Sequence, residues 1–148
     1  MRVLAFEDRV DIEALLISAS VAMADLTLEQ RWNSEDALQH IERVGPDVLL
    51  LDHFMPPMTG LQVLDALLKA VDAGDMARPQ IIVAMSSEPS CNEAMLARGA
   101  DHGIVKHRLV TLDFWQDRQL SAQVLMSFLR AGQTYREEMI FTLFLTPG

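Results

Sequence analysis

The sequence predicts an α/β fold: a doubly wound five-stranded parallel sheet with helices on both faces. Short apolar runs that contain β-branched residues alternate five times with longer segments of helical periodicity. The chain of 148 residues has the length of a single domain. A chain of this size can bury a core without disulfides or metal ions.

The first two strand–helix units are predicted as follows. Residues 3–6 form an apolar strand that stops at two acids. Residues 11–24 repeat apolar side chains at the i, i+3, i+4, i+7 spacing of a helix face. Residues 26–32 alternate apolar and polar side chains, as a half-exposed strand does. Ser34 is the expected N-cap of a second helix, which Gly45 and the proline after it terminate.

The remaining units begin with the most continuously apolar run, residues 48–51. Such a run is typical of a central parallel strand that helices cover on both faces. The other predicted elements are helices at 60–71, 92–98 and 112–129 and strands at 81–84 and 103–105.

The C-terminal end does not continue this alternation. A Gly at position 132 breaks the last helix, and six of the seven residues 139–145 are apolar. We therefore predict a domain at residues 1–130 and an apolar extension at residues 131–148. We expect this extension to pack back on the domain or to pair with a second copy in a homodimer.

Composition excludes several classes of protein. Twelve Lys and Arg against 21 Asp and Glu give a net charge of −9, which disfavours a nucleic-acid partner. One cysteine, Cys91, excludes a disulfide framework and a cysteine-based zinc site. No apolar run reaches the roughly 18 residues of a membrane-spanning helix, and the two early acids argue against a signal peptide. We expect a soluble cytoplasmic protein without a membrane partner.

Polar groups follow four of the predicted strands: Glu7 and Asp8 the first, Asp52 the third, Ser86 or Ser87 the fourth, and Lys106 the fifth. Because sites in such sheets form beyond the carboxyl ends of the strands, these groups should converge on one shallow pocket. Neighbouring carboxylates repel unless a cation offsets them, and Mg²⁺ prefers oxygen ligands. A carboxylate beside Mg²⁺ and a lysine is suited to attack a phosphoryl donor, with a serine hydroxyl holding one transferring oxygen.

Each of these signals also has an ordinary structural interpretation. An Asp after a strand often caps a helix or sits in a turn, and Asp8 with Arg9 could form a surface ion pair worth under about 1 kcal/mol. A lysine at a strand end is usually solvated. Their joint placement at four strand ends is what favours a site.

Residues 2–129 resemble a response-regulator receiver domain, the flavodoxin-like, chemotaxis-regulator fold of two-component phosphorelay signalling. The most specific stretch is LLLDHFMPPMTG at residues 49–60, with Pro56 four positions and Gly60 eight positions after Asp52. Gly60 permits a close approach of the next helix. Further resemblances are the acidic pair at positions 7 and 8, the Gly-Ala turn at 99 and 100, and the lysine at 106.

The resemblance implies a role for each matching residue. Asp52 would accept a phosphoryl group from a histidine kinase or a phosphotransfer protein. Asp8, Asp52 and the backbone carbonyl of Phe54 would bind Mg²⁺, with Glu7 acting through water. Lys106 would pair with the phosphoryl oxygens, and Ser86 would be the hydroxyl switch residue. Counting back from Lys106 without gaps reaches Ala84 instead, but Ser86 leaves the preceding apolar residues in the strand.

Three positions depart from the family pattern. Gly103 stands where the family usually has an aromatic residue whose rotamer reports phosphorylation. His107 stands where a proline is usual, and we predict a trans bond before it, because a cis bond before a non-proline residue costs about 2.5–4 kcal/mol. Phe54 places a bulky apolar group beside the acceptor, and we hypothesise that it hinders attacking water and prolongs the phosphorylated state.

Two functions remain open. In the first, the chain is a stand-alone receiver, or one cut from a longer protein; it is not an enzyme and signals through contact with a downstream protein partner. In the second, it is a phosphorylation-independent pseudo-receiver that acts as a dimerisation or scaffold module, as Gly103 and His107 favour and the intact acids and Lys106 oppose. A haloacid-dehalogenase-like phosphatase would need a second Asp two residues after the nucleophile, where Phe54 stands.

Overall fold

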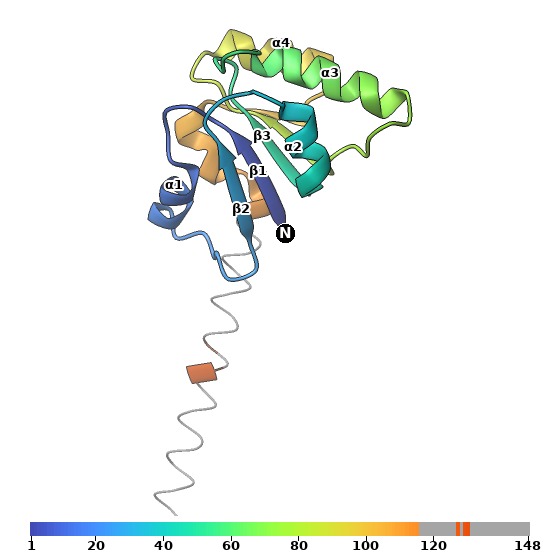
Figure 1. Cartoon of the computed structure of the whole chain (residues 1–148). Coiled ribbons are helices and arrows are strands. Elements are labelled where there is room, and N and C mark those ends of the chain that lie inside the picture. Colours follow the sequence, from blue (N-terminus) through green and yellow to red (C-terminus); the bar gives the residue numbers. More distant parts are fainter. Residues whose placement is uncertain (116–126, 128, 131–148) are drawn as a thin grey trace, which may run out of the picture.

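Five parallel strands form the central sheet of the computed structural model, in the order β2-β1-β3-β4-β5 (Figure 1). The structure describes residues 1–115, 127, 129 and 130. The elements are β1 (Arg2–Phe6), α1 (Ile12–Ser18), β2 (Thr27–Arg31), α2 (Ala37–Val44), β3 (Val48–Leu51), α3 (Gly60–Asp72), β4 (Ile81–Ala84), α4 (Pro89–Arg98), β5 (His102–Gly103) and the 3₁₀ helix η1 (Lys106–Thr111). The predicted doubly wound parallel sheet is confirmed.

Helices cover both faces of the sheet. Leu4 and Leu49 point to one face, in a core that α2, α3 and α4 complete, whereas Val3 and Leu50 point to the other, where α1 and η1 pack. Figure 1 shows α1 and the orange segment that contains η1 together on this second face. Because both faces are covered, β3 is buried along its whole length, as its continuous apolar run predicts.

The strand register places the carboxyl ends of four strands at one edge. Phe6 of β1 pairs with Leu51 of β3, Leu51 pairs with Ala84 of β4, and Ala84 pairs with Gly103 of β5. From β1 the chain continues to β2, which lies on one side of β1, and then returns to β3, which lies on the other side. The residues that follow these strands therefore meet at the point where the strand order reverses, which is where open α/β sheets place their sites.

Gly60 allows α3 to begin directly against the end of β3. A Cβ atom on Gly60 would lie 2.1 Å from the backbone oxygen of Asp52, so no other residue fits without a shift of the backbone. The backbone N–H of Gly60 donates to the carbonyl of His53 (2.9 Å). A capping box between Thr59 and Gln62 starts the helix at this point. The predicted close approach at Gly60 is confirmed.

Several predicted boundaries are wrong. The first helix ends at Ser18 rather than at residue 24, because Ser20 takes a left-handed conformation (φ 60°). The fourth helix begins at Pro89, three residues before the predicted start, since a proline is well suited to the first turn. The fifth strand is only His102–Gly103, because the chain turns into η1 soon afterwards.

The prediction that Ser34 caps α2 is also wrong. Asp36 occupies the N-cap position. The hydroxyl of Ser34 instead accepts from the N–H of Met58 (2.7 Å) and donates to its carbonyl (2.7 Å). Ser34 therefore ties the loop after β2 to the loop after β3, which carries the site.

The C-terminal predictions fall mostly outside the described residues. Residues 113–115 are helical, and the fully buried indole of Trp115 closes the core on the face of α1. The rest of the predicted helix, apart from residues 127, 129 and 130, and the whole extension 131–148 lie outside the described part. Among the described helices, none is both long and apolar enough to cross a membrane.

Candidate functional site

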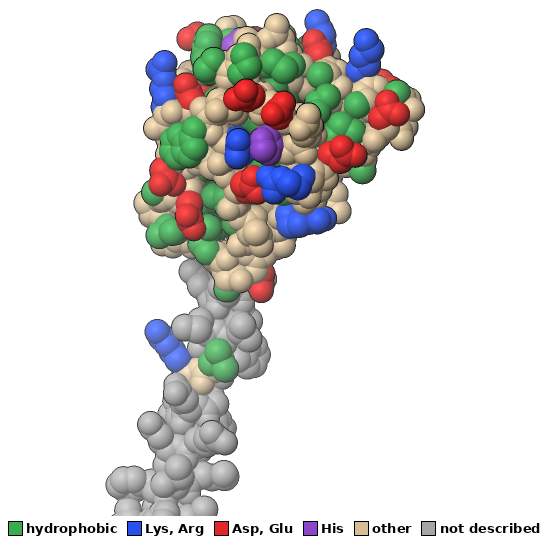
Figure 2. All heavy atoms as spheres, in the orientation of Figure 1, with side chains coloured by type: hydrophobic (Ala, Val, Ile, Leu, Met, Phe, Trp, Pro, Cys, Tyr) green, Lys and Arg blue, Asp and Glu red, His purple; other side chains and the backbone are tan. Residues whose placement is uncertain are grey.

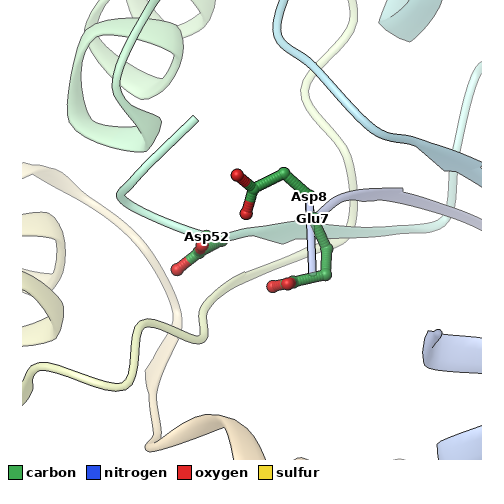
Figure 3. A group of neighbouring side chains, drawn as sticks. All are labelled: Glu7, Asp8 and Asp52. Carbon is green, nitrogen blue, oxygen red and sulfur yellow. The ribbon is translucent and has the colours of Figure 1, made fainter. Parts of the chain in front are cut away.

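Three carboxylates lie together at the carboxyl edge of the sheet. Glu7 and Asp8 follow β1, and Asp52 follows the adjacent strand β3. One oxygen atom from each of the three lies within 4.8 Å of the others. Figure 3 shows the three side chains gathered around the ends of these two strands. The predicted convergence of these acids is thus observed.

Glu7 is the most deeply buried of the three. Its side chain is fully inaccessible, and Oε1 accepts hydrogen bonds from the backbone N–H groups of Arg9 and Val10, both at 2.9 Å. Oε2 lies 2.6 Å from Nζ of Lys106. Glu7 therefore shapes the loop after β1 and at the same time anchors the lysine.

Lys106 begins η1 and reaches across the sheet edge. Its side chain is only 11% exposed, and Nζ lies 3.4 Å from Oδ2 of Asp52 in addition to its contact with Glu7. A single ammonium group thus bridges two of the three acids.

The peptide bond between Lys106 and His107 is trans, as predicted. Pro56–Pro57 is the one cis bond among the described residues.

Asp52 forms the floor of the site. It is 3% exposed, and Oδ1 accepts a hydrogen bond from the N–H of His53 at 2.8 Å. Burial raises the pKa of the Asp52 carboxyl above its usual value, Lys106 opposes this rise, and the negative charge of Glu7 adds to it. Without a further cation the site therefore disfavours the ionised carboxylate.

Asp8 is the most accessible of the acids, with 23% of its side chain exposed. Its Oδ1 atom is buried and makes no hydrogen bond within the described residues, and the Arg9 Nε atom is 4.0 Å away. Three carboxylates around one ammonium leave an excess of negative charge. A donor set of hard oxygens with such an excess fits a divalent cation such as Mg²⁺.

A pocket of about 280 Å³ opens beside the acceptor carboxylate. Phe54, with 56% of its surface exposed, lies at this pocket. Its ring packs edge-on against the His53 ring, with the two ring centroids 4.9 Å apart. The lining residues are Arg9, Asp52, Phe54, Ser87, Glu88 and Lys106. A donor molecule that enters this pocket meets Asp52 and Lys106 together.

A larger cavity of about 360 Å³ lies at the amino end of the sheet, away from the acids. Its two guanidinium groups, those of Arg2 and Arg78, are held by backbone carbonyls of Val44, Pro79 and Gly99. These arginines are committed to structural contacts, so the smaller pocket is the better candidate for chemistry.

Ser86 lies at the carboxyl end of β4 and is fully buried. Its hydroxyl accepts from the N–H of Glu88 at 3.2 Å, and its backbone N–H and C=O both bond to the side chain of Asn92. The neighbouring Ser87 lines the pocket in this conformation. The structure therefore brings Glu7, Asp8, Asp52 and Lys106 together, and leaves the Ser86 hydroxyl bonded within its own loop.

Two residues that support the site do not stand out in the sequence. Gln30 of β2 donates from Nε2 to the carbonyls of Glu7 (2.9 Å) and Val10 (2.8 Å), which fixes the acidic loop. Asn92 holds the loop that contains Ser86. Each stands among other polar residues of its element, so only its hydrogen bonds to backbone groups identify it.

Comparison with known proteins agrees with this geometry. The family model of the response regulator receiver domain matches residues 3–111, and the chain belongs to this family. Receiver domains are modules of two-component response regulators, which implies signalling by phosphorylation of an aspartate. The predicted resemblance is therefore confirmed.

Solved structures share the fold. The response regulator domain of Thermotoga maritima CheB is 20% identical, with a TM-score of 0.59 over 80% of this chain and 96% of that one. The activated receiver domain of Klebsiella pneumoniae RstA is 23% identical, with a TM-score of 0.59 over 80% and 98%. Vibrio cholerae CheY4 is 24% identical, with a TM-score of 0.57 over 77% and 97%.

Proposed function

We propose that the chain is a phosphorelay receiver in which Asp52 accepts a phosphoryl group from a histidine kinase or a phosphotransfer protein. The observation that carries this proposal is the position of the Asp52 carboxylate, buried at the floor of a pocket between Lys106 and the acidic pair after β1. No other acid of the cluster lines that pocket.

In the transfer step, an oxygen of Asp52 attacks the phosphorus of the donor. The new O–P bond forms as the P–N bond to the donor histidine breaks, and the ring nitrogen keeps the electron pair. Lys106 pairs with the phosphoryl oxygens, where its ammonium offsets the charge that develops on them. Because Nζ already contacts Asp52 and Glu7, it is positioned for this before the donor arrives.

The acidic cluster would hold Mg²⁺. Asp8 and Asp52 would be direct ligands together with the backbone carbonyl of Phe54, and Glu7 would act through water. When bound, the ion would neutralise charge on the transferring oxygens. The unbonded Oδ1 atom of Asp8 supports this assignment, as does the raised pKa of Asp52, which a nearby cation would lower.

Ser86 would be the hydroxyl switch residue. In the present conformation its Oγ atom bonds to the Glu88 backbone, within its own loop. We infer that the hydroxyl exchanges this bond for one to a phosphoryl oxygen on Asp52. Residues 85–88 connect β4 to α4 without forming a helix or strand, and Ser87 and Glu88 in this loop are exposed.

The output would be contact with a downstream protein in the cytoplasm, without a nucleic-acid or membrane partner and without enzymatic activity. On the face shown in Figure 2, Lys and Arg side chains are interspersed with Asp and Glu and form no continuous basic patch. Residues 131–148 would act as a second unit that packs on the domain or pairs with another copy. Sedimentation of the full chain and of a chain ending at residue 133 would test the pairing.

The alternative function is a phosphorylation-independent scaffold or dimerisation module. Gly103 favours it, because a residue without a side chain has no rotamer to report phosphorylation. One experiment separates the two functions: the mass of the intact protein after treatment with acetyl phosphate and Mg²⁺. Addition of one phosphoryl group to the wild type and not to Asp52→Ala supports the receiver. An unchanged mass of the folded wild type supports the scaffold.

A further inference from the structure

A buried asparagine of α4 binds the carboxyl end of β4. Asn92 is 4% exposed, and its Oδ1 atom accepts from the N–H of Ser86 at 2.8 Å. Its Nδ2 group donates to the carbonyl of Ser86 at 2.9 Å and to the carbonyl of Ile104 at 3.1 Å. All three partners are backbone groups. One carboxamide therefore binds both the N–H and the carbonyl of Ser86 and also the backbone after β5.

These partners border the site from two directions. Ser86 follows β4 at the edge where the acids gather, and Ile104 stands two residues before Lys106. The N–H of Ile104 also donates to the carbonyl of Ala84 at 2.9 Å. The ends of β4 and β5 and the start of α4 therefore meet at the side chain of Asn92.

A side chain at position 103 would meet Leu96 of α4, which is 40% exposed and would have to move. A Cβ atom on Gly103 would lie 2.6 Å from Cδ1 of Leu96 and 3.3 Å from Cβ of Asn92. The φ angle of Gly103 is not in the left-handed region, so the contact with Leu96, and not the backbone conformation, is what a larger residue would meet here. Side chains of α4 occupy the space next to β5 that a residue at position 103 would need.

We propose that Asn92 is a positioning residue that couples Ser86 directly to helix α4. This inference rests on the proposed function. A movement of Ser86 towards a phosphoryl group on Asp52 shifts both backbone groups that Asn92 holds. The carboxamide follows, because each bond left unmade would strand a buried polar group. Helix α4 then moves against β5. This coupling does not need the rotating aromatic side chain that the family usually has at the position of Gly103.

The chain contains its own reporter for this movement. Cys91 is the only cysteine, is partly exposed, and is the neighbour of Asn92 on α4. Its rate of modification by a thiol reagent is measured with and without acetyl phosphate and Mg²⁺, and the mass of the same samples reports phosphorylation. Couplings between sites usually change equilibria by about 5- to 150-fold, so we expect a change in rate of about fivefold or more in the wild type.

The test variant is Asn92→Leu, which keeps the branching and the number of side-chain heavy atoms and removes all three hydrogen bonds. We expect it to accept the phosphoryl group and to show the same Cys91 rate in both states. Glu93→Gln, an exposed neighbour on the same helix, is the matched control and should keep the wild-type ratio. A merely structural Asn92 would change stability and leave this ratio intact.

Each other outcome is decisive. If phosphorylated Asn92→Leu responds like the wild type, or if the phosphorylated wild type shows no change at Cys91, the coupling through Asn92 is wrong. If the wild type gains no phosphoryl mass, the proposed function fails first. If Asn92→Leu does not fold, the side-chain amide signals of Asn92 in the wild type decide by NMR: they must shift on phosphorylation, and unchanged signals overturn the inference.

Discussion

The ammonium nitrogen of Lys106 lies 2.6 Å from Oε2 of Glu7, a carboxylate with no exposed surface. The two residues come from the segment after β5 and the loop after β1, so this ion pair joins both ends of the described domain at the site. A buried charge without its partner is costly, whereas a neutral replacement of both partners is often tolerated.

Lys106→Met should therefore lower the free energy of unfolding by about 3–5 kcal/mol, the usual cost of leaving a buried charge unpaired. The double variant Glu7→Gln/Lys106→Met should recover most of that loss. Urea denaturation without Mg²⁺ measures both. A double variant that is less stable than Lys106→Met alone would show that the pair is not the source of the loss.

The raised pKa of Asp52 makes stability depend on pH. Between the unfolded pKa of about 3.9 and the higher folded value, the native state binds the proton more tightly, so the wild type loses stability as the pH rises through this window. Asp52→Asn should be more stable than the wild type at pH 7 without Mg²⁺, and the difference should disappear below the window. A constant difference across this pH range would contradict the assignment.

Mg²⁺ should stabilise the folded chain. At about 100 times its dissociation constant, a ligand of the native state adds about 2.7 kcal/mol to the free energy of unfolding. Asp8→Asn should remove most of this gain, and Asp75→Asn, at the opposite edge of the sheet, should retain it. Thermal unfolding with Mg²⁺ and with a chelator is the measurement. Equal gains in both variants would exclude Asp8 as a ligand.

Phe54 should protect the phosphorylated state. Its ring borders the pocket at Asp52, where it limits the approach of water. Phe54→Asn should release phosphate faster by about tenfold, which corresponds to about 1.4 kcal/mol of barrier. Phe54→Leu keeps an apolar side chain and should stay close to the wild type. Equal release rates for Phe54→Asn and the wild type would refute the hypothesis.

Gly60→Ala should destabilise the fold by about 3 kcal/mol, at the upper end of the cost of overpacking. Its Cβ atom would meet the backbone of Asp52 at 2.1 Å, and the backbone cannot move without distorting the site. Gly74→Ala, at a left-handed position with open space (φ 79°), should cost only about 1–2 kcal/mol. Denaturation curves would contradict this account if the two variants lost equal stability.

The part of the site that could be predicted from the sequence follows from strand ends. Short apolar runs precede Glu7, Asp52 and Lys106. Parallel strands bring such positions to one edge of the sheet regardless of the conformation of the connecting loops. The apolar run of β3 likewise predicts its own burial. These inferences depend only on local pattern and on the geometry of parallel sheets.

The rest depends on contacts between distant segments. Ser34 is suited to cap a helix by its residue type, but the loop after β3 takes its hydroxyl. Asn92 resembles an ordinary polar helix residue until its three backbone partners are seen. The absence of an aromatic residue at Gly103 is visible in the sequence, but the occupation of that space by Leu96 is not.

In the proposed function Asp52, and no neighbouring acid, carries the phosphoryl group. An acyl phosphate can be reduced by borohydride, which converts the modified aspartate to homoserine and marks its position. We would treat the protein with acetyl phosphate and Mg²⁺, reduce it, and sequence its peptides by tandem mass spectrometry. Homoserine at position 52 is the predicted result. Homoserine at position 8 instead, or no homoserine in the folded protein, would contradict the account.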